Sequence, residues 1–290
     1  MQLDIFEHGR DVMLRHDAIV ALLRRDAAAA GAACDRLAEA FPQDASLADL
    51  RALAGILAPA AVDPLKDHEA LRRACRRLDE VGAPAARRAL GDADGGRWLL
   101  PFWQDLARRC AQLPFKAACE VQHAAPLWLR AREWEAAAQA VATIPSWRRI
   151  PLPLRWMAEA QLHLRGLQST WPLLVELGWL SPSLLAGVAA TSPDPTLPRW
   201  VERFERQFEF AGDETDLAWL PAWLLTEQPS LVAHLAAAQP SRDEPPEQAM
   251  RLLVELLGLE RQGRHHDIVP RRKALRDLCP ELYAAYIRTR

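Results

Sequence analysis

A recurring order of elements constrains the fold of this chain most: a helix, a short turn, a second helix and a proline. Apolar residues repeat every three or four positions, as in α-helices, and the alternation typical of strands is nearly absent. In the first of these units, residues 24–26 (RRD) interrupt the apolar spacing. Pro42 ends the second helix, because a proline inside a helix breaks its hydrogen-bond ladder. This order predicts an all-α fold of antiparallel helix pairs.

The same order recurs three more times along the chain. The predicted turns are 132–134, 165–167 and 262–264, and the prolines that follow are Pro145, Pro182 and Pro280. These units resemble degenerate tetratricopeptide repeats (TPRs), whose helix pairs recur about every 34 residues and end in proline. Ala30 and Ala137 match the small residue of the second helix, and Trp134 and Leu167 match the bulky residue after the turn. The resemblance implies stacked antiparallel helix pairs, a TPR-like α-α superhelix (solenoid).

The connections between helices suggest how the chain is organised. We expect one TPR-like helical solenoid over residues 1–237 and a polar, proline-rich joint at 238–248. A C-terminal helical hairpin at 249–290 is expected to pack on the same solenoid. The shorter elements expected within the solenoid are helices at 68–81 and 84–90 and a turn at 92–96 (DADGG).

All eleven tryptophans lie between Trp98 and Trp223, so the middle of the chain is rich in tryptophan. Trp219 and Trp223 are four residues apart, which places them on one face of a predicted helix. Trp200 and Phe204 begin a similar stripe. Because these positions follow the apolar helical spacing, we interpret them as core packing between helices. The alternative is an aromatic groove for a peptide or a cationic ligand.

Composition argues against several classes of protein. The chain has 290 residues and a formal net charge of −2, so no global field attracts it to nucleic acid or to a membrane. Its five cysteines form no C-x-x-C pair, which disfavours a zinc ribbon or a disulfide framework. The sequence has neither the pattern of a signal peptide nor the run of about 18 apolar residues that a membrane helix needs. We therefore expect a cytoplasmic protein with no membrane partner.

Arginines gather at two places where they could bind phosphate groups. Arg72, Arg73, Arg76 and Arg77 lie on one broad face of the predicted helix at 68–81, and Arg87, Arg88, Arg108 and Arg109 extend it. The second cluster consists of Arg264, His265, His266, Arg271, Arg272, Lys273 and Arg276. Acidic residues such as Asp79, Glu80 and Asp277 lie close to both clusters in the sequence. We therefore interpret the clusters as solvated helix faces, and we do not expect nucleic acid as a direct partner.

The N-terminal pentapeptide QLDIF has two interpretations. It resembles the peptide with which bacterial replication and repair proteins dock on the sliding clamp. The resemblance implies that Gln2 would hydrogen-bond at the clamp's groove. Leu3, Ile5 and Phe6 would then fill hydrophobic pockets. Alternatively, Asp4 caps the first helix in a capping box with the glutamate three residues later, and the apolar side chains pack on the first helix pair. We favour the capped helix, because a five-residue match is short.

No sequence motif identifies a reaction. The chain lacks the nucleophile elbow, the phosphate-binding loop and the dinucleotide-binding fingerprint. His68 and Glu69 lack the second histidine of a zinc-binding helix, and residues 92–95 supply only part of a calcium loop. The neighbours His265 and His266 would project about 100° apart from a helix, which does not suit a shared metal. We therefore expect no catalytic residue, no metal and no cofactor.

Stacked helix pairs usually bind other proteins through their extended surfaces. On this fold-level analogy we expect a non-enzymatic bacterial adaptor or scaffold whose partner is a protein or peptide. The first alternative is an accessory factor of DNA replication or repair that docks on the sliding clamp through Gln2–Phe6. The second is an enzyme whose site is assembled from scattered residues.

Overall fold

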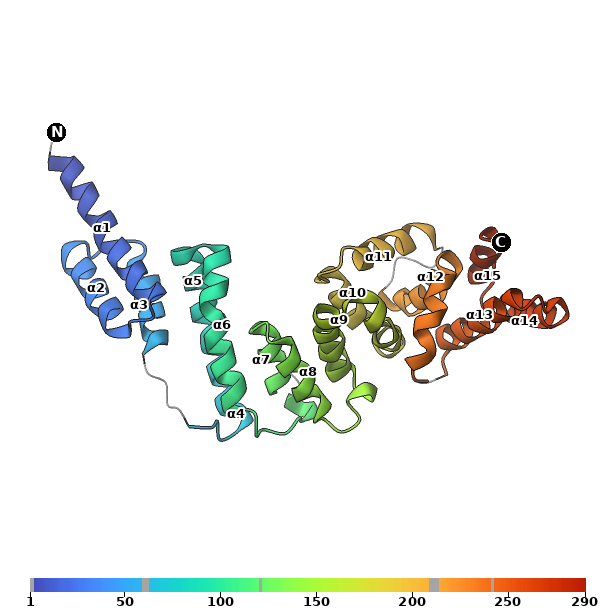
Figure 1. The fold of residues 1–290 in the computed structure, drawn as a ribbon. Helices are drawn as coiled ribbons and strands as arrows, with labels where there is room; N and C mark the ends of the chain where they lie inside the picture. Colours follow the sequence, from blue (N-terminus) through green and yellow to red (C-terminus); the bar gives the residue numbers. More distant parts are fainter. Residues whose placement is uncertain (1–2, 59–62, 120–121, 209–213, 241–242) are drawn as a thin grey trace. The chain divides into compact units, whose positions relative to one another are not determined.

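Helices make up the regular structure of the computed structural model, and its described residues contain no strand. The structure describes residues 3–58, 63–119, 122–208, 214–240 and 243–290 (Figure 1). Internal contacts divide the chain into two compact units, Met1–Glu133 and Trp134–Arg290. The all-α class predicted from the apolar spacing is confirmed for the described part of the chain.

In the first unit, helices that follow one another in the chain pack together. α1 packs on α2, α2 on α3, α5 on α6 and α6 on α7. The α-helices of this unit are α1 (Leu3–Leu23), α2 (Ala27–Ala40), α3 (Leu47–Leu57), α4 (His68–Arg76), α5 (Ala83–Leu90), α6 (Asp92–Arg109) and α7 (Ala124–Arg130). A π-helical turn, η1 (Arg77–Gly82), joins α4 to α5, and η2 (Ala117–Cys119) is a short 3₁₀ helix. The helix predicted at 68–81 is thus α4 continued by η1.

The second unit has a larger aromatic core, in which α9, α10, α12 and α13 bury most of the apolar side chains. Its α-helices are α8 (Trp134–Ala142), α9 (Pro151–Leu180), α10 (Pro182–Ala190), α11 (Thr196–Gln207), α12 (Leu220–Glu227), α13 (Pro245–Arg261), α14 (His265–Leu278) and α15 (Pro280–Arg288). Its 3₁₀ helices are η3 (Trp147–Arg149), η4 (Glu214–Trp219) and η5 (Pro229–Ala237). α13 packs on both α12 and α14, and η5 packs on α9.

The predicted turns fall at helix breaks that have local causes. Asp26 caps α2, because its carboxylate accepts the Ala29 N–H at 2.9 Å. Gly166 divides α9 into two helices, since its φ of 76° lies in the region that glycine adopts without strain. Gly263, with a φ of 67°, lies in the turn between α13 and α14. The turn predicted at 132–134 lies at 131–133, and α8 begins at Trp134.

The turn predicted at 92–96 is wrong, because these residues form the first turns of α6. Gly91, with a φ of 85°, ends α5 after Leu90, where the helix predicted at 84–90 also ends. Asp92 and Asp94 then lie in the first turn of α6, where carboxylates interact favourably with the helix dipole. A Cβ atom on Gly95 would lie 2.6 Å from the Ala86 carbonyl oxygen, so this glycine lets α6 approach α5 closely.

Two other expectations concern the second unit. Trp219 and Trp223 do not share one α-helix, because Trp219 ends η4 and α12 begins at Leu220. The joint predicted at 238–248 lies inside the second unit, and α13 already begins at Pro245. Residues 241–242 of that joint lie outside the described residues, so its role as a joint stays a prediction.

Candidate functional site

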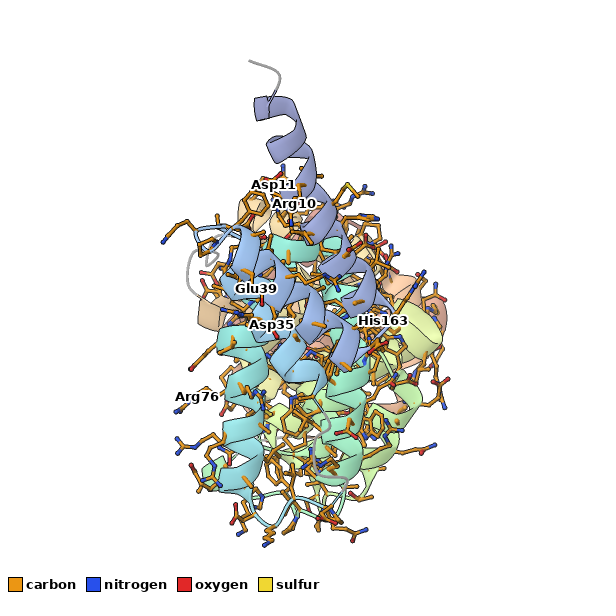
Figure 2. The ribbon with its side chains drawn as sticks, turned by 90° about the vertical axis from the view of Figure 1, so that its left-hand side faces the viewer. Arg10, Asp11, Asp35, Glu39, Arg76 and His163 are labelled. Carbon is orange, nitrogen blue, oxygen red and sulfur yellow. The ribbon has the colours of Figure 1, made fainter. Side chains whose placement is uncertain are left out.

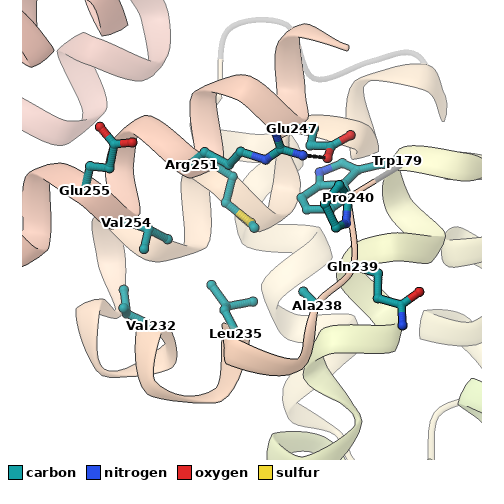
Figure 3. A pocket seen from close by; sticks show the side chains of 11 residues that line it. Trp179, Val232, Leu235, Ala238, Gln239, Pro240, Glu247, Arg251, Val254 and Glu255 are labelled. Atoms are coloured by element: carbon teal, nitrogen blue, oxygen red, sulfur yellow. Dashed lines mark hydrogen bonds and ion pairs between the residues drawn. The ribbon is translucent and has the colours of Figure 1, made fainter. Parts of the chain in front are cut away.

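A cavity of about 450 Å³ lies beside α13 in the second unit (Figure 3). Trp179 of α9, Leu235 of η5 and Met250 of α13 form its buried apolar wall. Val232 of η5 and Val254 of α13 are partly exposed, so the apolar wall is open to solvent. Figure 3 shows Val232 and Leu235 directed from η5 toward α13, with Trp179 at one end. This volume is in the range of sites that hold a small ligand or a few side chains of a partner.

Residues 238–240 close one end of the cavity, and hydrogen bonds fix their position. The Gln239 N–H donates to Oε1 of Glu176 at 2.7 Å, and Arg148 donates to the Ala237 carbonyl at 2.7 Å. Arg149 also donates to the Pro240 carbonyl. Arg148 itself makes a two-pronged ion pair with Glu176, whose exposed fraction is only 3%. These hydrogen bonds therefore fix this part of the cavity wall in position.

Charged residues of α13 form the rim of the cavity. Glu247 is only 1% exposed and accepts hydrogen bonds from Arg251 and, at 3.0 Å, from the Asp243 N–H. Figure 3 shows the Arg251–Glu247 pair above the apolar wall. Glu255, one turn farther along α13, pairs with Arg271 of α14 at 2.6 Å. The spacing of four residues places Glu247, Arg251 and Glu255 along one side of the helix.

The sequence did not identify these residues as a site. The sequence predicted only a C-terminal helical hairpin at 249–290 in this region. In the structure, Leu253 and Leu257 are buried in the core, whereas Val254 is partly exposed at the cavity. The sequence could have indicated the site only through an apolar surface on α13 that is wider than a single stripe. The opposite wall of the cavity comes from Trp179 and η5, which are distant from α13 in the sequence.

Carboxylates pair with three of the four arginines of the predicted arginine face. Arg72 makes two hydrogen bonds of 2.8 Å to Glu69, which also pairs with Arg73 at 3.5 Å. Arg76 extends away from α4 (Figure 2) and pairs with Glu80 at 3.5 Å. Arg77 donates to the Gly55 carbonyl at 2.7 Å. These four arginines therefore lie together on an exposed surface, but each has a partner within the first unit.

The four arginines of the second basic cluster are also paired. Arg264 pairs with Asp267 at 2.5 Å and Arg271 with Glu255 at 2.6 Å. Arg272 pairs with Glu260 at 3.3 Å and Arg276 with Asp277 at 3.8 Å. His265 and His266 are exposed in the first turn of α14.

The residues of the N-terminal pentapeptide are only partly described. Gln2 lies outside the described residues, and Leu3, Ile5 and Phe6 contribute helical backbone to the start of α1. Asp4 therefore lies within the first turn rather than before it, which differs from the predicted capping position. Figure 1 shows the first turns of α1 extending beyond the end of α2. Val12 and Met13, farther along α1, are exposed.

The tryptophans mostly pack into the two cores, as the apolar spacing predicted. The buried ones are Trp98, Trp103, Trp156, Trp171, Trp179 and Trp223. Phe204 is also fully buried and contacts Trp223 edge-to-face, with ring centroids 5.5 Å apart. Trp134 is partly exposed and stacks on His163 at 3.7 Å. The predicted aromatic stripe is thus part of the core and does not line an open groove.

The groups with the largest pKa shifts lie away from the cavity. Burial raises the pKa of the Cys75 and Cys279 thiols to about 11 and that of Cys110 to about 12. Burial and the nearby His68 lower the pKa of His123 to about 4. These thiols are mainly protonated at neutral pH, as in structural rather than reactive cysteines. Among the described residues, no group of three or more His, Cys, Asp or Glu side chains could hold a metal ion.

Comparisons with known proteins add no family to these observations. No protein-family model matches the chain, and neither characterised proteins nor solved structures give a significant match. Within the described residues, no helix is both long enough and apolar enough to cross a membrane.

Proposed function

We propose that this protein is a non-enzymatic interaction adaptor or scaffold of the TPR-like class, whose partner is another protein or a peptide. The observation that supports this function most directly is the cavity beside α13. Its wall is apolar, whereas the charges at its rim are already engaged in pairs such as Glu247–Arg251 and Glu255–Arg271. Such a site gains free energy chiefly by covering apolar surface, which is how a groove accepts a partner's side chains.

The TPR-like part of the proposal rests on the order of elements. Helices joined by short turns at 24–26, at Gly166 and at 262–264 support a chain built from helix pairs. In repeat proteins of this kind each pair buries its apolar face against its neighbours, and the exposed surfaces bind partners.

Affinity capture with the full chain tests the proposed function. The immobilised protein is incubated with a bacterial lysate, and retained proteins are identified by mass spectrometry. We expect at least one protein that also binds the purified chain with defined stoichiometry in isothermal titration calorimetry. Retention of nothing beyond the level of an unrelated all-helical protein would contradict the proposal.

The second candidate is an accessory factor of DNA replication or repair that docks on the sliding clamp through Gln2, Leu3, Ile5 and Phe6. The extension of α1 beyond α2 favours it, because a docking peptide must be accessible to the clamp (Figure 1). Ion pairs with Glu69 and Glu80 offset part of the charge of the arginine face and so reduce what it would contribute to binding of DNA. Direct binding to a purified sliding clamp distinguishes this candidate from the first.

A further inference from the structure

We propose that an arginine-rich surface of the first unit binds an acidic segment of a partner protein. This surface, the arginine face, consists of Arg72, Arg73 and Arg76 on α4 and Arg77 at the start of η1. Side chains three and four residues apart lie next to one another on a helix, so these four share one broad face. The inference rests on the proposed interaction function and specifies one binding surface and the chemistry of its ligand.

Glu69 is the first acidic residue of the arginine face, and several arginines share it. Its carboxylate accepts two hydrogen bonds of 2.8 Å from Arg72 and lies 3.5 Å from Arg73. The hydrogen bond from Arg72 lowers the pKa of Glu69, and the positive charges of Arg73 and Arg76 lower it further. One carboxylate therefore lies in the field of three guanidiniums.

The rest of the arginine face gains only one further carboxylate. Glu80 lies 3.5 Å from Arg76, whose side chain extends away from α4 (Figure 2). Arg77 donates to the Gly55 carbonyl at 2.7 Å, and a carbonyl group carries no net charge. Four guanidiniums and two carboxylates leave an excess of two positive charges on the arginine face.

Carboxylates of the surrounding helices do not remove this excess, because arginines outside the face pair with them. The pairs on α3, η1 and α6 are Asp49–Arg88, Asp79–Arg130, Asp92–Arg87, Asp94–Arg97 and Asp105–Arg109. Residues 47–130 contain thirteen lysines and arginines but only ten aspartates and glutamates, although the whole chain has a net charge of −2. This region therefore stays positive when all of its charged residues are counted.

Separate carboxylates suit this surface better than the backbone of a nucleic acid. A guanidinium binds a carboxylate through two parallel hydrogen bonds, as Arg72 does with Glu69. Duplex DNA carries one negative charge about every 1.7 Å along its axis, so it would also place phosphates against Glu69 and Glu80. A peptide can place its carboxylates beside the guanidiniums alone.

The spacing of the arginines indicates the spacing of the partner's acidic residues. Arg73 and Arg77 are four positions apart, which is about 6 Å along the helix axis. Two residues separated by one other residue in an extended segment are about 7 Å apart and point to the same side. An extended segment with an acidic residue at every second position therefore fits the arginine face.

Fluorescence anisotropy with the full chain tests this inference. The probe is a labelled peptide of about 12 residues in which glutamate and serine alternate. The comparison probes are the same peptide with lysine in place of glutamate and a thymidylate oligonucleotide of equal negative charge. We expect the glutamate peptide to bind more tightly than both, with an affinity that falls as the NaCl concentration rises. No binding of the glutamate peptide, or tighter binding of the oligonucleotide, would refute the inference.

Two double variants of equal net charge locate the site. Arg73→Gln with Arg76→Gln removes the excess charge from the arginine face and should weaken binding of the glutamate peptide at least about tenfold. The control, Arg264→Gln with Arg276→Gln, removes two exposed arginines from the second unit and should leave the affinity nearly unchanged. Equal weakening would show that binding follows the net charge of the chain and would overturn the proposed site.

Glu69→Gln with Glu80→Gln tests the inference in the opposite direction. This change raises the excess on the arginine face from two to four positive charges, so the glutamate peptide should bind more tightly. A gain in affinity requires a folded protein, so this variant decides the question even if the arginine variants unfold. Unchanged or weaker binding would contradict the inference.

Capture from the lysate separates this inference from the proposed function. If the chain retains a protein partner but does not bind the glutamate peptide, the arginine face is wrong and the interaction function stands. If neither experiment yields a ligand, both proposals fail.

Discussion

The Arg148 guanidinium donates two hydrogen bonds to the carboxylate of Glu176, with N–O distances of 2.7 and 2.6 Å. The pair joins η3 to α9, and Glu176 also accepts the Gln239 N–H. Because Glu176 is almost fully buried, these donors stabilise its negative charge in place of water. One ion pair therefore fixes both the packing of η3 and the segment that closes the cavity.

Removal of Arg148 should destabilise the protein strongly. We expect Arg148→Leu to lower the free energy of unfolding by about 3 kcal/mol, because it leaves a buried carboxylate without its counter-ion. Urea denaturation measures this loss. The control Arg276→Leu breaks an exposed pair with Asp277 and should cost less than about 1 kcal/mol. Similar losses in the two variants would mean that the buried pair contributes no more than the exposed one.

Two adjacent glycines of α6 should respond oppositely to alanine. Gly95→Ala places a methyl group 2.6 Å from the Ala86 carbonyl oxygen, so α5 and α6 must separate. We expect a loss of about 1–3 kcal/mol in the free energy of unfolding. Gly96→Ala points into open space and should raise stability by up to about 1 kcal/mol through helix propensity. Thermal melts of the two variants should shift in opposite directions, and a common shift would contradict the close approach of the helices.

His123 should make the protein less stable in acid. Its Nδ1 accepts the Ala125 N–H at 3.2 Å at the start of α7, which requires a neutral ring. Burial and the charge of His68 lower its folded pKa to about 4, whereas an unfolded histidine titrates near about 6.5. The unfolded chain therefore binds the proton first. The contribution of His123 to stability therefore falls as the pH drops from about 6.5 to about 4, by about 3 kcal/mol in all.

Urea unfolding of His123→Asn across this pH range isolates the effect. Asparagine does not titrate, and its side-chain oxygen can still accept the N–H at the helix start. We expect the variant to lose less stability than the wild type between neutral pH and pH of about 4. Parallel pH profiles would show that His123 is not the responsible group.

Replacement of Leu3 and Phe6 by alanine tests the clamp-docking candidate. If the pentapeptide docks, the double variant should lose binding to a purified sliding clamp in surface plasmon resonance and keep its melting temperature. If the stretch is packed as a helix start, the same change should lower stability by about 2–5 kcal/mol. We expect the melting temperature of the double variant to stay unchanged, because the first turns of α1 extend beyond α2 (Figure 1). Val12→Ala is the control, since this exposed residue lies outside the pentapeptide.

Tryptophans of the second unit should differ in their contribution to stability. Trp223 is fully buried and packs against Phe204, so Trp223→Ala should cost about 3–5 kcal/mol. Trp134 is partly exposed and stacks on His163, so we expect Trp134→Ala to cost only about 1–2 kcal/mol. Guanidinium denaturation measures both. Equal costs would mean that Trp134 fills the helix-pair interface, as its position after the turn suggested.

The sequence by itself determined the helices and most of their limits, because these depend on neighbouring residues. Apolar residues at helical spacing predicted α1, α2, α13 and α14. The breaks at 24–26 and at Gly166 followed from an aspartate that caps a helix and a glycine that adopts a positive φ. Burial of most tryptophans followed from the same spacing. Glu80, one helical turn from Arg76, also predicted an ion pair on the arginine face.

Tertiary structure decided the features that depend on distant residues. The DADGG segment has the composition of a turn, yet it is helical, and Gly95 fits α6 against the α5 backbone. The partner of Arg148 is 28 positions away, and the partner of Arg88 is Asp49, 39 positions away. The cavity needs Trp179, η5 and α13 side by side. Local spacing specifies only which face of a helix is apolar. Which surface covers that face, and what part of it stays open to a partner, is decided by how the helices pack.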